Sequence, residues 1–224
     1  MDADRKAASA MLMQQELWNK RWQNMWRGEA TNCLAVCFWA QRIRPRAKGV
    51  ILDLGAGDGP DTLWFAQQGL SVLAADFSSA ALSRLEERCE HHGVSHLVRT
   101  LHSSISELAL PEKSVDYVYS HLGIHFFDNN DTNRIFGNIE KWLQPNGSLG
   151  LKVKSTADPM YGKGDELDEN VFLLDGQLRR LFAASEIEKL LGGFEIHILE
   201  EYLGPYPGYA FDQGLIDVMA TKRS

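Results

Sequence analysis

Residues 50–59 read Val-Ile-Leu-Asp-Leu-Gly-Ala-Gly-Asp-Gly, and this stretch decides the fold class. Its first half is a short apolar run, typical of a strand buried within a parallel sheet. Alternating glycines follow at Gly55, Gly57 and Gly59. Glycine permits a tight turn and lets a ligand approach the backbone where a Cβ would clash. The stretch therefore predicts a strand that ends in a ligand-binding turn.

A second strand is predicted over residues 71–76, and it also ends in an acid, Asp76. A glycine loop after one strand and an acid at the end of the next are typical of a nucleoside-binding α/β domain. Dinucleotide-binding loops need a third small residue, but this position is Pro60. The loop is flanked by acids, Asp53 and Asp61 among them, which favour a positively charged ligand over a pyrophosphate.

The composition is that of one globular domain over residues 1–224, with 44% hydrophobic and 24% charged residues. No run approaches the ~18–20 apolar residues of a membrane span. Residues 1–6 are polar and lead into no signal-peptide core, so we expect a cytoplasmic protein that has no membrane partner. Its oligomeric state is expected to be a monomer or a homodimer.

The charge and the cysteine content argue against further classes of protein, namely nucleic-acid-binding and disulfide-rich proteins. The net charge is −7, and the richest basic patch, residues 42–48, is short, whereas binding to nucleic acid needs many phosphate contacts. We therefore expect no nucleic-acid partner. Cys33 and Cys37 form no disulfide framework and are expected to be buried free thiols. The acids within residues 165–169 are interpreted as a solvated loop, so no metal is expected.

The rest of the chain alternates between strand and helix patterns. Helices are predicted over residues 10–42 (one or two helices), 60–68, 79–92, 131–143 and 185–191, and strands over 49–54, 71–76, 97–102, 114–120, 148–154, 195–202 and 215–222. Residues 144–147 are predicted to form a turn, and Ser185 with Glu188 a capping box. Five strands alternating with helices, then two joined without one, predict a three-layer α/β sandwich. Its seven-stranded sheet is mostly parallel, with an antiparallel last strand.

Residues 53–59 resemble the first motif of the class I S-adenosylmethionine-dependent methyltransferases: an acid, any residue, then alternating glycines. The strand pattern is also that of this Rossmann-like family, and the resemblance covers about residues 15–223. The resemblance implies that S-adenosylmethionine is the cofactor. The segment after residue 154 resembles small-molecule members of the family, including tellurite-resistance-like proteins.

The resemblance implies several cofactor-binding residues. Asp53, Gly55 and Gly57 match positions that line the methionine end of the cofactor in the family. Asp76 matches the acid that holds both ribose hydroxyls, and a carboxylate can accept two hydrogen bonds at once. Phe77 follows it and would cover one face of the adenine.

Two further segments match the motifs of the family less closely. The family often has an acid and an apolar residue after the third strand, to bind the adenine, but this chain has Ser104 and Ile105. Serine accepts the hydrogen bond from the adenine amino group more weakly than a carboxylate does. After the fourth strand, His121 matches a residue beside the sulfonium, and open α/β sheets bind ligands at such strand ends. His121 and His125 are the candidate general bases, His121 is also a candidate cofactor contact, and His125 a candidate substrate contact.

Residues 10–42 are expected to form a helical lid, because Leu17 to Trp22 resemble the family's aromatic-x-x-Arg-aromatic element. Trp18, Trp22 and Trp26 lie on one stripe of a helix. The resemblance implies that Trp18 and Arg21 contact the cofactor and that Trp22 lies beside the substrate. Docking of the stripe on the sheet is the alternative. Residues 155–177 are expected to be an insertion over the active site, with Tyr161 in the substrate pocket.

These features predict methyl transfer to a small-molecule acceptor by in-line displacement. The nucleophile of the acceptor is oxygen, nitrogen, sulfur or another chalcogen, and the sequence does not distinguish among them. The alternatives are a methyltransferase acting on protein or nucleic acid, and a non-catalytic cofactor-binding module. A short-chain oxidoreductase would need Tyr-x-x-x-Lys, but Asp165 stands four residues after Tyr161.

Overall fold

The structure is a computed structural model that describes residues 13–14, 16–23, 30–44, 48–206 and 210–224. Helices cover α2 Cys33–Phe38, η1 Trp39–Ile43, α3 Pro60–Gln67, α4 Ser79–His91, η2 Ser95–Leu97, η3 Ile124–Phe126, α5 Asn129–Trp142 and α6 Ala184–Leu190, and residues 16–23 are also helical. Strands cover β1 Val50–Leu54, β2 Ser71–Asp76, β3 Val98–His102, β4 Val115–His121, β5 Leu143–Lys154, β6 Asp165–Asp168, β7 Val171–Leu174, β8 Gln177–Arg180, β9 Phe194–Gly204 and β10 Gln213–Lys222.

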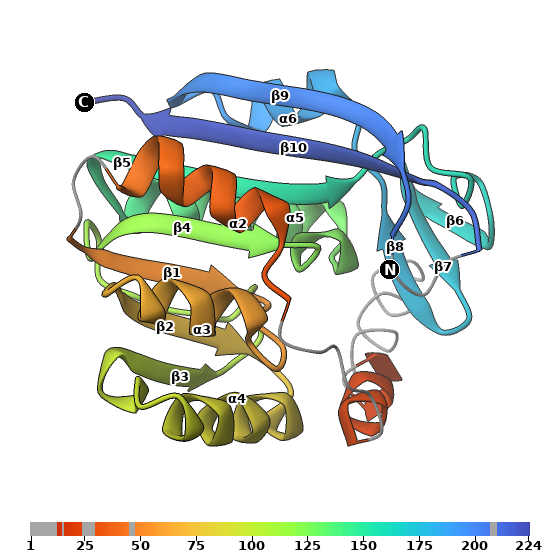
Figure 1. Ribbon diagram of the computed structural model, residues 1–224. Helices are drawn as coiled ribbons and strands as arrows, with labels where there is room; N and C mark the ends of the chain where they lie inside the picture. Colours follow the sequence, from red (N-terminus) through yellow and green to blue (C-terminus); the bar gives the residue numbers. More distant parts are fainter. Residues whose placement is uncertain (1–12, 15, 24–29, 45–47, 207–209) are drawn as a thin grey trace.

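A seven-stranded sheet in the order β3-β2-β1-β4-β5-β10-β9 forms the middle layer (Figure 1). Its first five strands are parallel, and β10 pairs antiparallel with both β5 and β9. The predicted three-layer α/β fold, with its mostly parallel seven-stranded sheet, is therefore confirmed. The strand order reverses between β1 and β4, which is where open α/β sheets bind their ligands.

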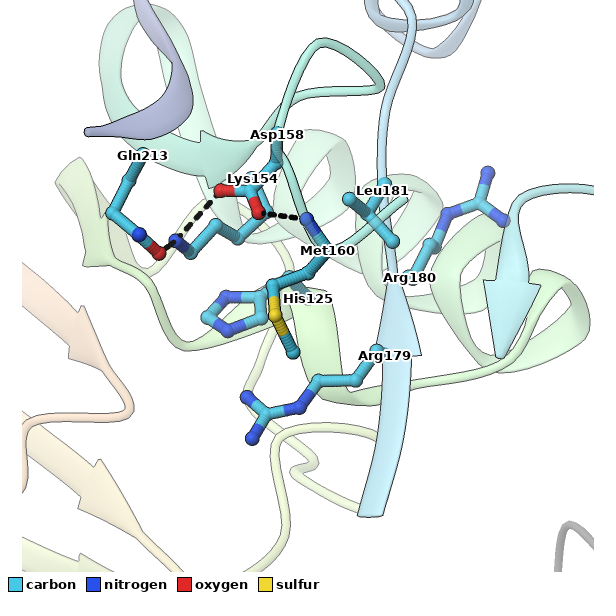
Figure 2. A pocket seen from close by; sticks show the side chains of 8 residues that line it. All are labelled: His125, Lys154, Asp158, Met160, Arg179, Arg180, Leu181 and Gln213. Carbon is cyan, nitrogen blue, oxygen red and sulfur yellow. Dashed lines mark hydrogen bonds and ion pairs between the residues drawn. The ribbon is translucent and has the colours of Figure 1, made fainter. Parts of the chain in front are cut away.

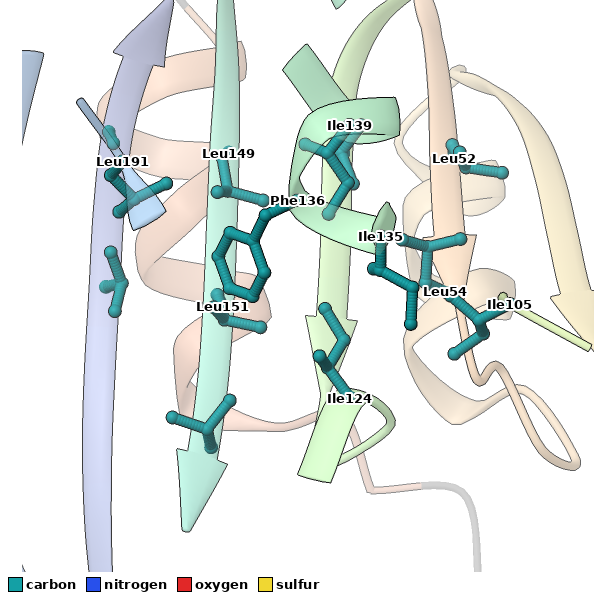
Figure 3. Packing of buried hydrophobic residues seen from close by; sticks show 14 of the residues in the cluster. Leu52, Leu54, Ile105, Ile124, Ile135, Phe136, Ile139, Leu149, Leu151 and Leu191 are labelled. Atoms are coloured by element: carbon teal, nitrogen blue, oxygen red, sulfur yellow. The ribbon is translucent and has the colours of Figure 1, made fainter. Parts of the chain in front are cut away.

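Successive side chains along each strand point to opposite faces of the sheet, so the core is divided into two layers. Ile51 of β1 packs with α2, α3 and α4 on one face, together with Tyr117 and Tyr119 of β4. Leu52 and Leu54 point to the other face. There, Figure 3 shows Ile135, Phe136 and Ile139 of α5 directed at the sheet. A parallel strand buried on both faces reads as a continuous apolar run, which is why residues 50–54 were recognisable.

Two predicted local features are wrong. Residues 144–147 do not form a separate turn, because β5 already begins at Leu143, and Asn146 within it has φ 62°. Gly147 allows this irregular start: a Cβ there would lie 2.9 Å from the carbonyl oxygen of Asp116. The capping box is also absent, since Ala183 is the N-cap of α6 and no side chain caps it.

Cys33 and Cys37 are exposed free thiols, contrary to the expected burial. The helix α2 has only six residues, and Leu34, Ala35 and Phe38 occupy its buried face. Cys33 and Cys37 therefore lie on its outer side. Within the described residues, no helix has the length and apolar character needed to cross a membrane.

Residues 155–177, expected to be an insertion over the active site, contain β6 and β7 of a second, small sheet that β8 completes. The strands β6, β7 and β8 pair antiparallel in that order and lie beyond the end of β5 (Figure 1). Val171 and Leu178 form its own small apolar cluster. The carbonyl of Lys154 accepts a hydrogen bond from Phe182 N at 2.8 Å, which ties the end of the small sheet to β5.

Gly150→Val is expected to lower the free energy of unfolding by about 1–3 kcal/mol, because overpacking in a dense core forces side chains off their rotamers. A Cβ at Gly150 would lie 2.8 Å from the ring of Phe38. Gly137→Ala is the matched control: it lies in α5 with open space around it, and we expect a gain of roughly 0.5–1 kcal/mol. Urea unfolding measures the free energy of unfolding of both variants. Equal stability of Gly150→Val and wild type would contradict the close packing of Phe38 on Gly150.

Candidate active site

The glycine loop after β1 is held against the end of β2. Gly55, Gly57 and Gly59 all have positive φ, at 76°, 59° and 74°, a conformation that favours glycine. The carboxylate of Asp76 accepts hydrogen bonds from Gly57 N at 2.9 Å and from Ser78 N at 2.8 Å. The sequence-predicted residues from two separate strands therefore meet at one place, the carboxyl edge of the sheet.

Asp53 lies beneath this loop and is almost completely buried. Its carboxylate accepts a hydrogen bond from the Thr62 hydroxyl at 2.6 Å. Burial, together with the nearby Asp61 and Asp76 charges, raises the pKa of Asp53 to about 8, and the Thr62 hydrogen bond opposes this rise. Near neutral pH this carboxyl therefore keeps a proton in the ligand-free protein.

The two other acids of the loop are held by protein groups. Asp61 accepts hydrogen bonds from Tyr119 Oη at 2.9 Å and from Asn32 N at 2.8 Å. Asp58 lies 3.2 Å from the guanidinium of Arg88, and both side chains are buried. Arg88 is therefore the cationic partner of Asp58. Among the acids in and around the loop, this leaves Asp53 and Asp76 as the candidates for contact with a ligand.

The helix over residues 16–23 covers the loop. Trp22 is buried, and a Cβ at Gly57 would lie 2.7 Å from its indole ring, so the ring rests directly on the glycine. The ring of Trp18 lies edge-on to Phe126 at 5.3 Å. Arg21 is exposed and lies over the Trp18 ring at 5.1 Å. Trp26, the third residue of the stripe, lies outside the described residues.

The segment after β3 borders the same loop. Ile105 is buried, and its Cδ1 would lie 3.6 Å from a Cβ at Gly55. Ser104 is also buried, and its hydroxyl shares a hydrogen bond with that of Ser106 at 3.0 Å. Phe77 follows Asp76 and is half-buried, and its carbonyl lies 2.9 Å from His102 Nε2.

The two predicted histidines lie after β4 but in different surroundings. His121 is half-buried at the end of the strand, in register with Lys152 of β5, and stacks on Tyr206 at 5.9 Å. His125 belongs to η3, is buried, and lies against Phe126. The sequence grouped the two histidines together, and the structure places His125 in the lining of a cavity.

This cavity has a volume of about 40 Å³ and lies between the end of β5 and β8 (Figure 2). Its lining residues are His125, Lys154, Asp158, Met160, Arg179, Arg180, Leu181 and Gln213. The Lys154 amine donates to Asp158 at 2.9 Å and also to Gln213. Sequence reasoning did not find Lys154, Arg179 or Arg180. One signal was present, since Lys152 and Lys154 interrupt the apolar run of β5.

Tyr161 does not lie in this cavity lining. Its side chain is 45% exposed, and its hydroxyl donates to Asn170 Oδ1 at 2.9 Å. It packs edge-on to Phe172 at 5.4 Å. Its assignment to a substrate pocket stays a prediction. Within the described part of the chain, no group of three or more histidine, cysteine or acidic side chains is placed to hold a metal ion.

Comparison with known proteins identifies the central region. Residues 51–147 match the family model described as a methyltransferase domain. This region is a class I methyltransferase domain. The solved structure of 1,6-didemethyltoxoflavin-N1-methyltransferase from Burkholderia thailandensis, with bound S-adenosylhomocysteine, has the same fold: the TM-score is 0.74 at 21% identity, covering 97% of this chain and 89% of that chain. The structure of TehB from Haemophilus influenzae gives 0.71 at 16% identity, covering 88% of this chain and 64% of that chain.

Curated relatives of the methyltransferase domain act on different kinds of molecule. Malonyl-[acyl-carrier protein] O-methyltransferase of Pectobacterium atrosepticum is 29% identical over 162 residues, which is 71% of this chain and 59% of that protein. A histone-arginine methyltransferase of Drosophila persimilis is 29% identical over 100 residues, 45% of this chain and 19% of that protein. The chain thus spans less than two thirds of the length of these relatives.

Asp53→Asn is expected to change how stability depends on pH in the ligand-free protein. The pKa of Asp53 is about 8 in the folded state, against an ordinary value near 3.8. As pH rises from 4 to 8, the unfolded chain releases this proton and the folded chain keeps it, so the wild type loses stability. Asparagine does not titrate, so the variant gains relative to wild type, by at most about 1.4 kcal/mol per pH unit.

Urea unfolding at several values between pH 4.5 and 8 measures this difference. Asp165→Asn, at an exposed carboxylate on β6, is the control for removing a charge. A stability difference between Asp53→Asn and wild type that stays constant over this range would contradict the raised pKa.

Proposed function

We propose that the protein transfers a methyl group from S-adenosylmethionine to a small-molecule acceptor. The observation that carries this proposal is the hydrogen bond from Gly57 N to Asp76, which joins the glycine loop to the acid of the next strand at 2.9 Å. The match of residues 51–147 to the methyltransferase domain supports it. The glycine loop also lies where the strand order of the sheet reverses, between β1 and β4, which is where open α/β sheets bind ligands.

The donor set fits this cofactor. Asp53 and Asp76 are buried beside a loop whose glycines leave the backbone accessible. An ammonium group beside Asp53 would replace the proton that this carboxyl holds and relieve the repulsion among the acids. Asp76 already accepts two backbone hydrogen bonds, and its two oxygens have further lone pairs for ribose hydroxyls.

We assign the remaining cofactor contacts by position. Gly55 and Gly57 allow close approach of the methionine end, and His121 lies near it at the end of β4. Ile105 and Phe77 would lie against the adenine, with the Ser104 hydroxyl as acceptor for its amino group. The helix carrying Trp18, Arg21 and Trp22 acts as a lid that excludes water, because Trp22 already covers Gly57.

When bound, the cofactor supplies an electrophilic methyl group on a sulfonium, so the protein must chiefly position the acceptor and exclude water. The cavity beside η3 holds part of the acceptor, and the small sheet β6–β8 closes it on one side. His125 lines this cavity and is the candidate base for an acceptor that carries a removable proton. Thiols and reduced chalcogens need no such base.

Asp76→Ala is expected to weaken binding of S-adenosylhomocysteine by about tenfold or more, since hydrogen bonds to a charged group contribute about 1.5–3 kcal/mol. Isothermal titration calorimetry measures the affinity. Asp76→Asn keeps one carbonyl acceptor, so its affinity for S-adenosylhomocysteine should fall less than that of Asp76→Ala. Asp165→Ala, on the exposed edge of β6, is the control and should bind as wild type does. Unchanged affinity in Asp76→Ala would refute the ribose assignment.

An acceptor screen tests the reaction itself. We expect release of S-adenosylhomocysteine in the presence of at least one class among phenols, amines, thiols and oxyanions. A parallel incubation of tritiated cofactor with protein and nucleic-acid extracts tests the alternative acceptors. Label confined to macromolecules would contradict the small-molecule proposal, and a failure to bind S-adenosylhomocysteine would contradict the cofactor assignment as well.

A further inference from the structure

Asp53 is a buried carboxyl at the centre of the sheet. It is 3% exposed, and it stands in register with Ala74 of β2 and Tyr119 of β4, so strands flank it on both sides. Its carboxylate accepts a hydrogen bond from the Thr62 hydroxyl at 2.6 Å. A hydroxyl satisfies one acceptor position but brings no positive charge. It therefore does not replace the solvation that an ionised carboxylate loses on burial.

Two other acids lie close to Asp53 on neighbouring elements. Asp61 of α3 and Asp76 of β2 both disfavour a negative charge on Asp53. The Tyr119 hydroxyl donates to Asp61 at 2.9 Å, and burial raises the pKa of this phenol well above its ordinary value, so it stays neutral. Within the described residues, no lysine or arginine forms an ion pair with Asp53. The surroundings of Asp53 in this part of the chain therefore favour its protonated form.

Further charged and titratable groups lie in and around the glycine loop. Asp58 lies 3.2 Å from the guanidinium of Arg88, and this buried pair brings one charge of each sign. His102 stands at the end of β3 and His121 at the end of β4. Histidines generally change charge between about pH 5 and pH 8, so an experiment on Asp53 must distinguish it from these two side chains.

The charge of Asp53 depends on what binds beside it. With a pKa of about 8, raised chiefly by burial, this carboxyl holds a proton near neutral pH in the ligand-free protein. A cation in contact with a carboxyl favours its ionised form, and this attraction is stronger in a buried site than in water. A ligand that brings an ammonium group to Asp53 therefore reverses the balance between the two forms of the carboxyl.

We propose that the cofactor binds by proton exchange at Asp53: the ammonium group of its amino acid end enters, and the proton of the Asp53 carboxyl leaves to solvent. The carboxyl O–H bond is the one that breaks, and the charge balances because one cation enters the site as another leaves. The inference rests on the proposed function for the position of the amino acid end beside Asp53. Because binding releases a proton, the affinity for the cofactor rises with pH below about 8 and levels off above it.

The test compares S-adenosylhomocysteine with 5′-methylthioadenosine, which shares its adenosine and sulfur but has no amino acid. Each ligand is titrated calorimetrically into the full chain at about pH 6.5, in PIPES and in Bis-Tris, two buffers with different enthalpies of ionisation. We expect S-adenosylhomocysteine to release about one proton and to bind about tenfold more tightly at pH 7 than at pH 6. 5′-Methylthioadenosine should release almost none, and its affinity should be the same at both pH values.

Asp53→Asn assigns the proton to its residue. This variant should bind S-adenosylhomocysteine without releasing a proton, and Asp165→Asn, at an exposed carboxylate of β6, is the matched control and should release it as wild type does. Proton release that persists in Asp53→Asn would overturn the proposal and point to His102 or His121.

The comparison of the two ligands on the wild-type chain decides the matter even if Asp53→Asn does not fold. Equal proton release with both ligands would overturn the proposal. Binding of S-adenosylhomocysteine without proton release would overturn the exchange and leave the proposed function standing. If neither ligand binds, the proposed function fails, and the exchange fails with it.

Discussion

The Asp76 carboxylate holds together the three chain segments that form the candidate cofactor site. It ends β2, accepts from Gly57 in the loop after β1, and accepts from Ser78 at the start of α4. A loop of three glycines in left-handed conformations has high conformational entropy when unfolded, so a buried charge-assisted hydrogen bond is needed to fix it. Sheet pairing then places the loop, because Gly55 N and Ala56 N both donate to the carbonyl of Ala75.

Burial of charge constrains the rest of the site. A buried ion needs a partner or it loses its charge, since desolvation costs several kcal/mol per ion. Asp58 has Arg88, Lys154 has Asp158, and Arg180 has Glu186. Burial instead raises the pKa of Asp53 to about 8, and the hydrogen bond from the Thr62 hydroxyl offsets only part of that rise. The loop is therefore built around one carboxyl whose charge depends on what binds beside it.

Local sequence patterns were sufficient for most of the fold and for the meeting of the glycine loop with Asp76. The buried strands read as apolar runs, and the glycines follow β1 directly. The small sheet β6–β8 was not predicted because its strands have only four residues each, and β6 and β8, on either side of the apolar β7, are mostly polar. The cavity was missed for another reason: His125, Lys154 and Arg179 come from three separate elements, so no spacing in the sequence connects them.

The helix near the N-terminus links the two halves of the site. Gln14 donates to the carbonyl of Phe126 at 3.2 Å and accepts from Leu178 N at 3.0 Å, so it joins η3 to β8. Those elements carry His125 and Arg179, which line the cavity, while Trp22 of the same segment rests on Gly57 of the cofactor loop. Any displacement of this segment alters the cover of the glycine loop and the walls of the cavity together. The proposed function requires both regions to close around the reactants, and one segment that contacts both meets this requirement without a separate hinge for each.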